Sequence, residues 1–145
     1  MRLLPFLVAF AVTACTTAEA QDPAATPTGV EWELLAIDGQ VVDIPATLRL
    51  GETGGVGGKA PCNSYGGQNR AELPDFRLSP LRVTRMACDR LADEKLYLST
   101  LSAMTRVDRL DDRTLVLTGP DGRSMEFARD LMSTLTRCTT CAPKG

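Results

Sequence analysis

Apolar and polar residues alternate along several short stretches of the chain, with the period of a β-strand that buries one face. The clearest stretch is 29–34 (GVEWEL), where Trp32 is the only tryptophan and is expected to anchor the core. The pair Asp38-Gly39 then predicts a turn. Shorter strand candidates follow at 41–42, at 47–50 and at 76–78, the last leading through Pro80 to Leu81 and Val83.

Two further alternating stretches lie close together near the end of the chain. Residues 115–117 (LVL) and 125–127 (MEF) are separated by the sequence GPDG at 119–122. Such a turn signal between two strand patterns predicts a β-hairpin. Four of its side chains are expected to share the core face, namely Leu115, Leu117, Met125 and Phe127.

One segment, 89–107, shows helical spacing instead. Asp89 can serve as the N-cap, and Asp93 and Glu94 lie near the positive end of the helix dipole. The apolar residues expected on one face are Leu91, Leu98, Leu101 and Met104. Together these elements predict an α+β fold, a single small domain in which one helix covers an antiparallel β-sheet.

The most unusual stretch is 54–67, GGVGGKAPCNSYGG. Its glycines permit backbone angles that are closed to other residues and allow a neighbouring chain to approach closely. We therefore expect Cys62 to Tyr65 to lie in a tightly shaped turn between two strand-like pieces. The stretch matches neither a phosphate-binding loop nor a nucleophile elbow, because Thr53, Ala60 and Cys62 stand where those motifs require glycine.

The first 28 residues read as an export signal followed by a tether. Arg2 precedes an apolar run, 3–14, which is too short for a membrane span of about 20 residues but suits a secretory signal. The sequence VTAC at 12–15 is similar to a lipobox, which would make Cys15 an acylated first residue. Alternatively, AEA at 18–20 is a site for ordinary signal peptidase. We favour residues 1–14 as a lipoprotein signal peptide and 15–28 as a flexible tether.

Composition excludes several classes of function. A net charge of −2 argues against a nucleic-acid surface, which would normally be basic. The 145-residue chain contains no histidine. Catalysis by Ser-His-Asp or Cys-His groups within one chain is therefore excluded.

Several motifs together resemble the META/HslJ domain family. They are an amino-terminal W-E-L, a glycine-rich strand entering C-N-x-Y-x-G, a later T-R-M-x-C that leads into a helix, and a terminal strand ending near D-L-M. The matching residues are Trp32, Gly58, Cys62, Asn63, Tyr65, Gly67, Thr84, Arg85, Met86, Cys88, Phe127, Asp130, Leu131 and Met132. The resemblance covers 29–132. It implies an exported protein, often a lipoprotein, linked to heat shock or antibiotic tolerance, with no catalytic residue or cofactor to carry over. The tail, 133–145, departs from the family pattern.

The cysteine count predicts two bridges. Without Cys15 four cysteines remain, an even number for an oxidising compartment. We predict a disulfide between Cys62 and Cys88, which would stabilise the fold by about 3–4 kcal/mol. Two buried free thiols are the alternative. For Cys138 and Cys141 a local disulfide is favoured over a redox pair or half of a zinc site.

The sequence thus predicts a non-enzymatic envelope lipoprotein with no catalytic residue, cofactor or metal. It would face the periplasm from the outer membrane or, alternatively, be soluble in the periplasm. Its partners would be the membrane, through the lipid anchor, and an unknown envelope ligand or protein, but no nucleic acid. The alternative function is a periplasmic thiol–disulfide redox protein using Cys138 and Cys141. Hydrolysis by the adjacent carboxylates of Asp111-Asp112 or Asp93-Glu94 is less favoured.

Overall fold

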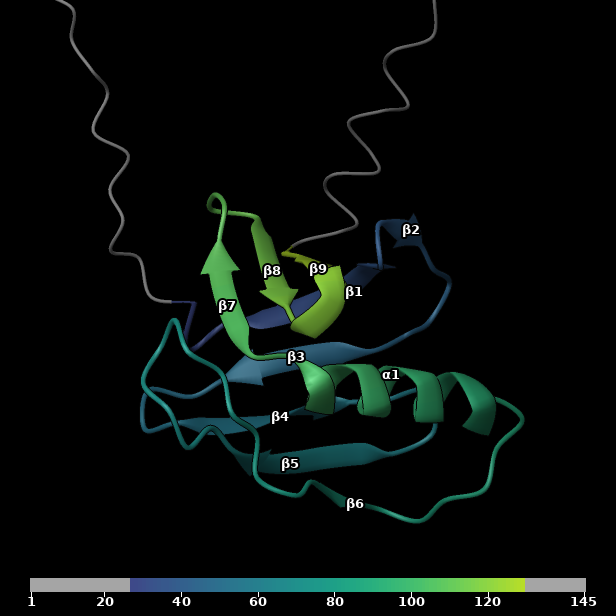
Figure 1. Cartoon of the computed structure of the whole chain (residues 1–145). Helices are drawn as coiled ribbons and strands as arrows, with labels where there is room; N and C mark the ends of the chain where they lie inside the picture. The colour runs from purple at the N-terminus through teal and green to yellow at the C-terminus, as the bar shows by residue number, and fades with distance from the viewer. Residues whose placement is uncertain (1–26, 130–145) are drawn as a thin grey trace, which may run out of the picture.

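Nine β-strands and one α-helix make up the part of the chain that the computed structural model describes, residues 27–129. In chain order they are β1 Glu31–Ile37, β2 Gln40–Val41, β3 Thr47–Leu50, β4 Gly55–Lys59, β5 Ser64–Gln68, β6 Arg82–Val83, α1 Leu91–Ala103, β7 Arg106–Arg109, β8 Thr114–Thr118 and β9 Ser124–Ala128, with a 3-10 turn at Pro120–Gly122. The predicted fold class is confirmed: an antiparallel sheet in one small domain, with a single helix in the described range (Figure 1).

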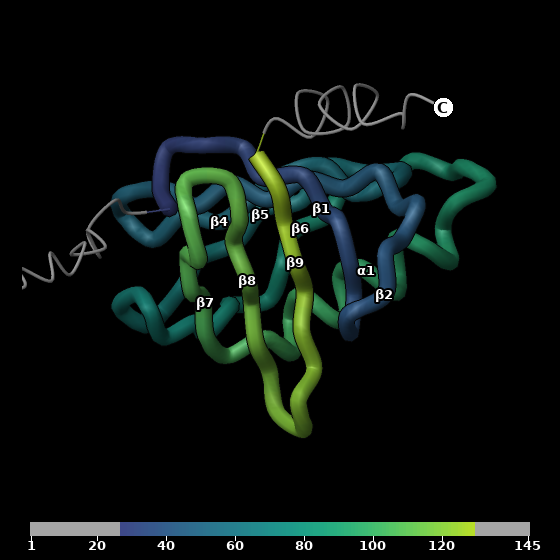
Figure 2. The backbone as a smooth tube through the Cα atoms, turned by 90° about the horizontal axis from the view of Figure 1, so that it is seen from above, coloured from purple at the N-terminus to yellow at the C-terminus, as the bar shows by residue number. Residues whose placement is uncertain are grey.

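All nine strands belong to one sheet, in the order β6-β5-β4-β3-β1-β9-β8-β7, with β2 paired to β1. Each pairing of neighbours is antiparallel. Figure 2 shows β7, β8, β9 and β1 lying side by side. The first long strand of the domain and its last strand are therefore hydrogen-bonded partners in the middle of the sheet.

The helix packs on one face of the sheet through its central aromatic residue, Tyr97, which is fully buried. The Tyr97 ring lies 5.7 Å from the ring of Tyr65 on β5 and 6.5 Å from that of Phe127 on β9, in edge-to-face geometry in both cases. Trp32 is buried as predicted. The four hairpin residues predicted for the core are also fully buried, namely Leu115, Leu117, Met125 and Phe127.

The predicted helix was too long at both ends. It begins at Leu91, and no side-chain hydrogen bond caps it, so Asp89 is not the predicted N-cap. It ends at Ala103, because Met104 is extended and the Thr105 N–H donates to the Thr118 carbonyl at 2.8 Å. The following residues then form β7, a strand that the helical prediction had absorbed.

The buried face of the helix also differs from the predicted one. Leu101 and Met104 are buried, but Leu91 is 49% exposed. Besides Tyr97 and Leu101, the buried helix residues are Glu94 and Thr100, so polar side chains take half of the inner positions. A leucine pattern could not locate this face, because the polar side chains on it are buried through hydrogen bonds rather than through hydrophobicity.

The strap, which we define as residues 74–83, joins the two ends of the sheet. At its start, the Phe76 N–H donates to the Thr105 carbonyl, and the Pro74 carbonyl accepts from Val107 of β7, both at 2.8 Å. Further on, the Ser79 N–H donates to Gln68 of β5 at 2.8 Å, and β6 continues this pairing. The stretch predicted as a strand at 76–78 is thus held by isolated bridges, and the strap borders the outer strand β7 at one end of the sheet and supplies the outer strand β6 at the other.

Candidate functional site

The glycine-rich stretch forms most of a two-stranded hairpin, so the predicted turn does lie between two strands, but it is shorter than the predicted Cys62 to Tyr65 because Ser64 and Tyr65 belong to β5. Most of the glycines lie in β4 and β5, and only the connection around Cys62 is a turn. The register places Gly57 opposite Gly66 and Gly58 opposite Tyr65. Because successive residues of a strand face opposite sides, the hairpin has two different faces. Val56, Gly58, Tyr65 and Gly67 face the helix, whereas Gly55, Gly57 and Gly66 face outward.

On the inner face, Gly58 makes room for a cluster of hydroxyl groups. A Cβ atom at this position would lie 2.1 Å from the Thr47 carbonyl oxygen of the neighbouring strand. The hydroxyl oxygens of Tyr65 and Tyr97 lie 2.8 and 2.9 Å from the same carbonyl oxygen, and 2.8 Å from each other. Burial raises the pKa of both phenols well above the ordinary value of 10.0.

This phenol pair predicts a steep loss of stability in alkali. Because the pKa of each phenol is higher in the folded than in the unfolded state, the stability that the protonated phenols contribute is fully present below pH 10.0. This contribution is lost as the pH rises above 10.0 towards the higher pKa of the folded state. With two such groups, we expect the free energy of unfolding to fall by about 3 kcal/mol per pH unit there. Tyr65 and Tyr97 are the only tyrosines of the chain, so phenolate absorbance reports on them alone. It should rise together with the loss of circular dichroism, and a rise near pH 10.0 in folded protein would contradict the prediction.

The turn between β4 and β5 is joined to the residues that precede the helix. The predicted Cys62–Cys88 disulfide is present, with the two Cα atoms 5.8 Å apart. The Glu94 carboxylate accepts the Cys62 N–H at 3.0 Å and the Asn63 amide at 2.8 Å. The Asn63 side-chain oxygen in turn accepts the Thr84 hydroxyl at 2.9 Å and the Met86 N–H at 2.7 Å. These contacts give the C-N and T-R-M-x-C motifs a structural role.

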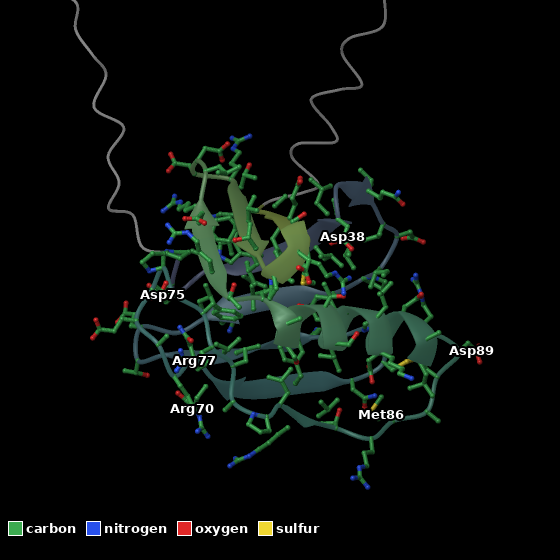
Figure 3. The ribbon with its side chains drawn as sticks, in the orientation of Figure 1. Asp38, Arg70, Asp75, Arg77, Met86 and Asp89 are labelled. Carbon is green, nitrogen blue, oxygen red and sulfur yellow. A yellow bond between two sulfur atoms is a disulfide. The ribbon has the colours of Figure 1, made fainter. Side chains whose placement is uncertain are left out.

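The side chains of two residues in the second motif take no part in these contacts. Arg85 and Met86 are exposed, and Met86 keeps 64% of its accessible surface. Figure 3 shows Met86 at the outside of the molecule. The disulfide and the Asn63 contacts hold the backbone on either side of Arg85. These two side chains are therefore displayed at the surface beside β6.

The outer face of the hairpin is the floor of a groove of about 1040 Å³ that we call the basic groove. The strand register fixes its central row, which runs from Glu31 through Arg49, Gly57 and Gly66 to Arg82. Residues in register face the same side of a sheet. Two arginines thus stand on either side of two glycines that place no side chain between them.

The rim of the basic groove is cationic, although the chain as a whole carries a net charge of −2. Its charged lining residues are Glu31, Arg49, Lys59, Arg70 and Arg82. Arg49 donates to the Glu31 carboxylate at 3.0 Å. Among residues 27–129, the other three cations form no ion pair, and all are exposed. Because an unpaired guanidinium group binds carboxylate or phosphate through parallel hydrogen bonds, the groove is suited to an anion.

The adjacent carboxylates lie elsewhere and have structural contacts. The Asp111 carboxylate accepts the Arg113 N–H at 2.7 Å, and this hydrogen bond lowers its pKa. Asp112 pairs with Arg109 at 2.7 Å, and Asp93 with Arg90 at 2.8 Å. In the described range, no group of three or more Cys, Asp and Glu side chains is arranged to hold a metal ion. No helix in that range is long and apolar enough to cross a bilayer.

Comparison with known protein families places these features in one domain type. The META domain profile matches residues 25–131. The chain belongs to the META domain family. That range contains the basic groove, the buried tyrosines and the Cys62–Cys88 bridge of this META domain. The predicted resemblance to the META/HslJ family is thereby confirmed.

Solved structures agree with this assignment. The META domain fold is similar to that of a protein from Burkholderia xenovorans solved by NMR, with a TM-score of 0.59 and 25% sequence identity over 90% of this chain and 99% of that one. A second NMR structure has a TM-score of 0.52 and 23% identity, covering 71% of this chain and 92% of the other, and supports the fold alone. A search of curated proteins gave no match.

Several predicted residues lie outside the described range. They are the lipidation candidate Cys15, the pair Cys138 and Cys141, and the D-L-M residues Asp130, Leu131 and Met132. The signal peptide and most of the tether are also outside it. Their assignments stay predictions.

Sequence reasoning missed the basic groove of the META domain. The signal that could have revealed its floor is the glycine on each side of Val56 and the glycine after Tyr65, which leave one face of the two strands without side chains at Gly55, Gly57 and Gly66. The rim had no such signal. Arg49 and Arg82 are 33 residues apart in the sequence, and only the pairing of four strands places them on opposite sides of the same groove.

Proposed function

We propose that this protein is an exported, non-enzymatic envelope lipoprotein whose META domain binds an anionic partner in the basic groove. The observation that carries the proposal is the arrangement of Arg49 and Arg82 on either side of a floor without side chains. Lys59 and Arg70, near the ends of the hairpin, add to the positive rim. This arrangement concentrates positive charge around a hollow, which attracts anions.

The proposed location rests on the first 28 residues. In the reading we favour, Cys15 is acylated and residues 15–28 link the anchor to the domain. Several acyl chains hold a protein stably at a membrane, since each buried CH₂ contributes about 0.8 kcal/mol. Intact-mass analysis of protein from the native membrane fraction tests this point. A chain that begins at acylated Cys15 is expected, and an unmodified chain beginning at Gln21 would instead indicate a soluble periplasmic protein.

The proposed role is tolerance of envelope stress, including heat and antibiotics, as the family membership suggests. The test is complementation of a deletion strain with the Arg70→Gln/Arg82→Gln variant of the full-length protein. We expect this variant to restore less tolerance than wild type, because both changes remove positive charges of the groove that have no ion pair among residues 27–129.

A matched control removes two exposed charges elsewhere in the domain, in the variant Lys95→Gln/Arg113→Gln. It should restore tolerance fully at equal protein abundance. If the groove variant complements as well as the control does, the groove has no part in the function. If the deletion itself leaves stress sensitivity unchanged, the stress role is wrong.

A further inference from the structure

We propose, building on the function proposed above, that the ligand of the basic groove is the headgroup of an anionic membrane lipid that carries two separated phosphate groups. The positions of the cations carry this step. Arg49 and Arg82 lie at the two ends of a row of four strands, and three strand spacings put their backbones about 14 Å apart. An anionic group at each rim lets each arginine make its own charge-assisted hydrogen bonds, so a ligand with two separated phosphates matches this row.

The other two cations extend the same pattern along the hairpin. Lys59 is paired with Ser64 across the hairpin, and Arg70 lies six residues after Ser64 in the chain. Six residues of extended chain span about 20 Å, so Lys59 and Arg70 lie near opposite ends of the hairpin. Arg82, Lys59 and Arg70, together with Arg49 in its ion pair with Glu31, thus surround an uncharged centre made by Gly57 and Gly66. A complementary ligand has anionic groups at its periphery and an uncharged, compact linker between them.

The floor of the groove excludes two other kinds of recognition. β4 is paired on both sides by β3 and β5, and β5 by β4 and β6, so the floor offers no free strand edge to the backbone of a peptide. None of the residues that line the groove is aromatic, so a sugar or base ring has no stacking partner there. Binding must therefore come mainly from the cations, with the linker of the ligand lying on the glycines.

The entry of the tether favours a membrane lipid over a soluble phosphate compound. Thr28 forms a β-bridge with Leu50, and the next residue, Gly51, lines the groove. The chain that leads from the proposed anchor therefore joins the domain beside the groove. The 13 residues from Cys15 to Thr28 span at most about 45 Å when fully extended, which keeps the groove close to the bilayer.

The test measures binding of residues 15–145 to vesicles, with Cys15→Ser so that no acyl chain contributes. Three vesicle types are compared: neutral phosphatidylcholine alone, and phosphatidylcholine mixed with either phosphatidylglycerol or cardiolipin, the last two matched in total charge. Cardiolipin joins two phosphates through a glycerol, whereas phosphatidylglycerol has one. We expect at least about tenfold tighter binding to the cardiolipin vesicles than to those with phosphatidylglycerol, the gain from at least one additional charge-assisted hydrogen bond.

Two variants separate the groove from general attraction of charge. Gly66→Val fills the floor without changing any charge, and a Cβ there would meet no atom closer than the Val56 carbonyl oxygen at 3.8 Å, so the fold is expected to keep its melting temperature. It should abolish the preference for cardiolipin. Arg82→Gln should weaken cardiolipin binding about tenfold, whereas Lys95→Gln on α1 should leave it unchanged.

Soluble competitors identify the source of the phosphates. The deacylated cardiolipin headgroup should displace the protein from vesicles, whereas pyrophosphate, with adjacent phosphates, should not. Equal binding to both anionic vesicle types, or an unaltered preference in Gly66→Val, would overturn the inference. So would stronger displacement by a glutamate-rich peptide than by the headgroup. If these assays fail while Arg70→Gln/Arg82→Gln still loses stress tolerance, the lipid is wrong and the proposed function stands.

Discussion

Replacement of Gly58 by alanine is expected to destabilise the domain by about 4 kcal/mol or more. The added Cβ would lie 2.1 Å from the Thr47 carbonyl oxygen, which belongs to the backbone and cannot rotate away. β4 must then move away from β3, and the buried hydroxyls of Tyr65 and Tyr97 lose the carbonyl that both of them contact. The change thus combines steric overlap with the loss of buried hydrogen bonds.

Chemical denaturation, followed by circular dichroism, measures this effect. Gly55→Ala is the matched control, because it lies on the same strand and no atom lies within 4 Å of its added Cβ. The control should change the unfolding free energy by less than about 1 kcal/mol. Equal stability of the two variants would show that the close approach of β3 and β4 at Gly58 is not required.

Replacement of Asn63 by alanine is the second change with a large expected effect, and it should lower the free energy of unfolding by about 4 kcal/mol. The Asn63 side chain is buried and donates to Glu94 and to the Met86 carbonyl, while it accepts from Thr84 and from the Met86 N–H. Its removal leaves the buried Glu94 carboxylate with the Cys62 N–H as its remaining partner. Partners of a deleted buried group cannot recover these bonds from water.

Asn69→Ala provides the comparison for this variant. Its side chain also makes three hydrogen bonds, to Asp75, Ala71 and Arg77, but it is only half-buried, so water can replace the lost contacts. We expect this change to lower the free energy of unfolding by about 1 kcal/mol. Denaturant titration with the disulfide intact measures both variants. Similar losses of unfolding free energy in the two would show that burial does not make the Asn63 hydrogen bonds more important than those of Asn69.

The sequence predicted best those features that depend on period-two alternation. Trp32 and the pair Leu115 and Leu117 are apolar residues at alternate positions, and each is buried where this pattern places it. The cysteine count predicted bridges in general, and the Cys62–Cys88 pairing was predicted because it closes the glycine turn onto the residue that leads into the helix. The family motifs include Trp32, Cys62 and Cys88, so the α+β fold could be predicted from the sequence alone.

The features that could not be predicted depend on buried polar groups and on strand register. Glu94 and Thr100 occupy the inner face of α1 because the turn at Asn63 and the side chain of Arg123 supply hydrogen bonds to them, at 2.8 and 3.3 Å respectively. No local pattern encodes these distant partners. In the same way, the groove forms only when β3 to β6 pair in this register. That pairing places Arg49 on one side of Gly57 and Gly66, and Arg82 on the other side.

The central pairing of β1 with β9 has a consequence for the order in which the domain folds. A strand from the beginning of the domain and one from its end hydrogen-bond to each other, with Leu34 opposite Phe127. Loop closure over such a separation makes folding slow compared with that of proteins dominated by local contacts. A chain that emerges from a translocation channel with its amino terminus first cannot complete this sheet until β9 has also emerged. On the export route proposed above, we therefore expect the domain to stay in an incompletely folded state during transport and to fold only after β9 has crossed.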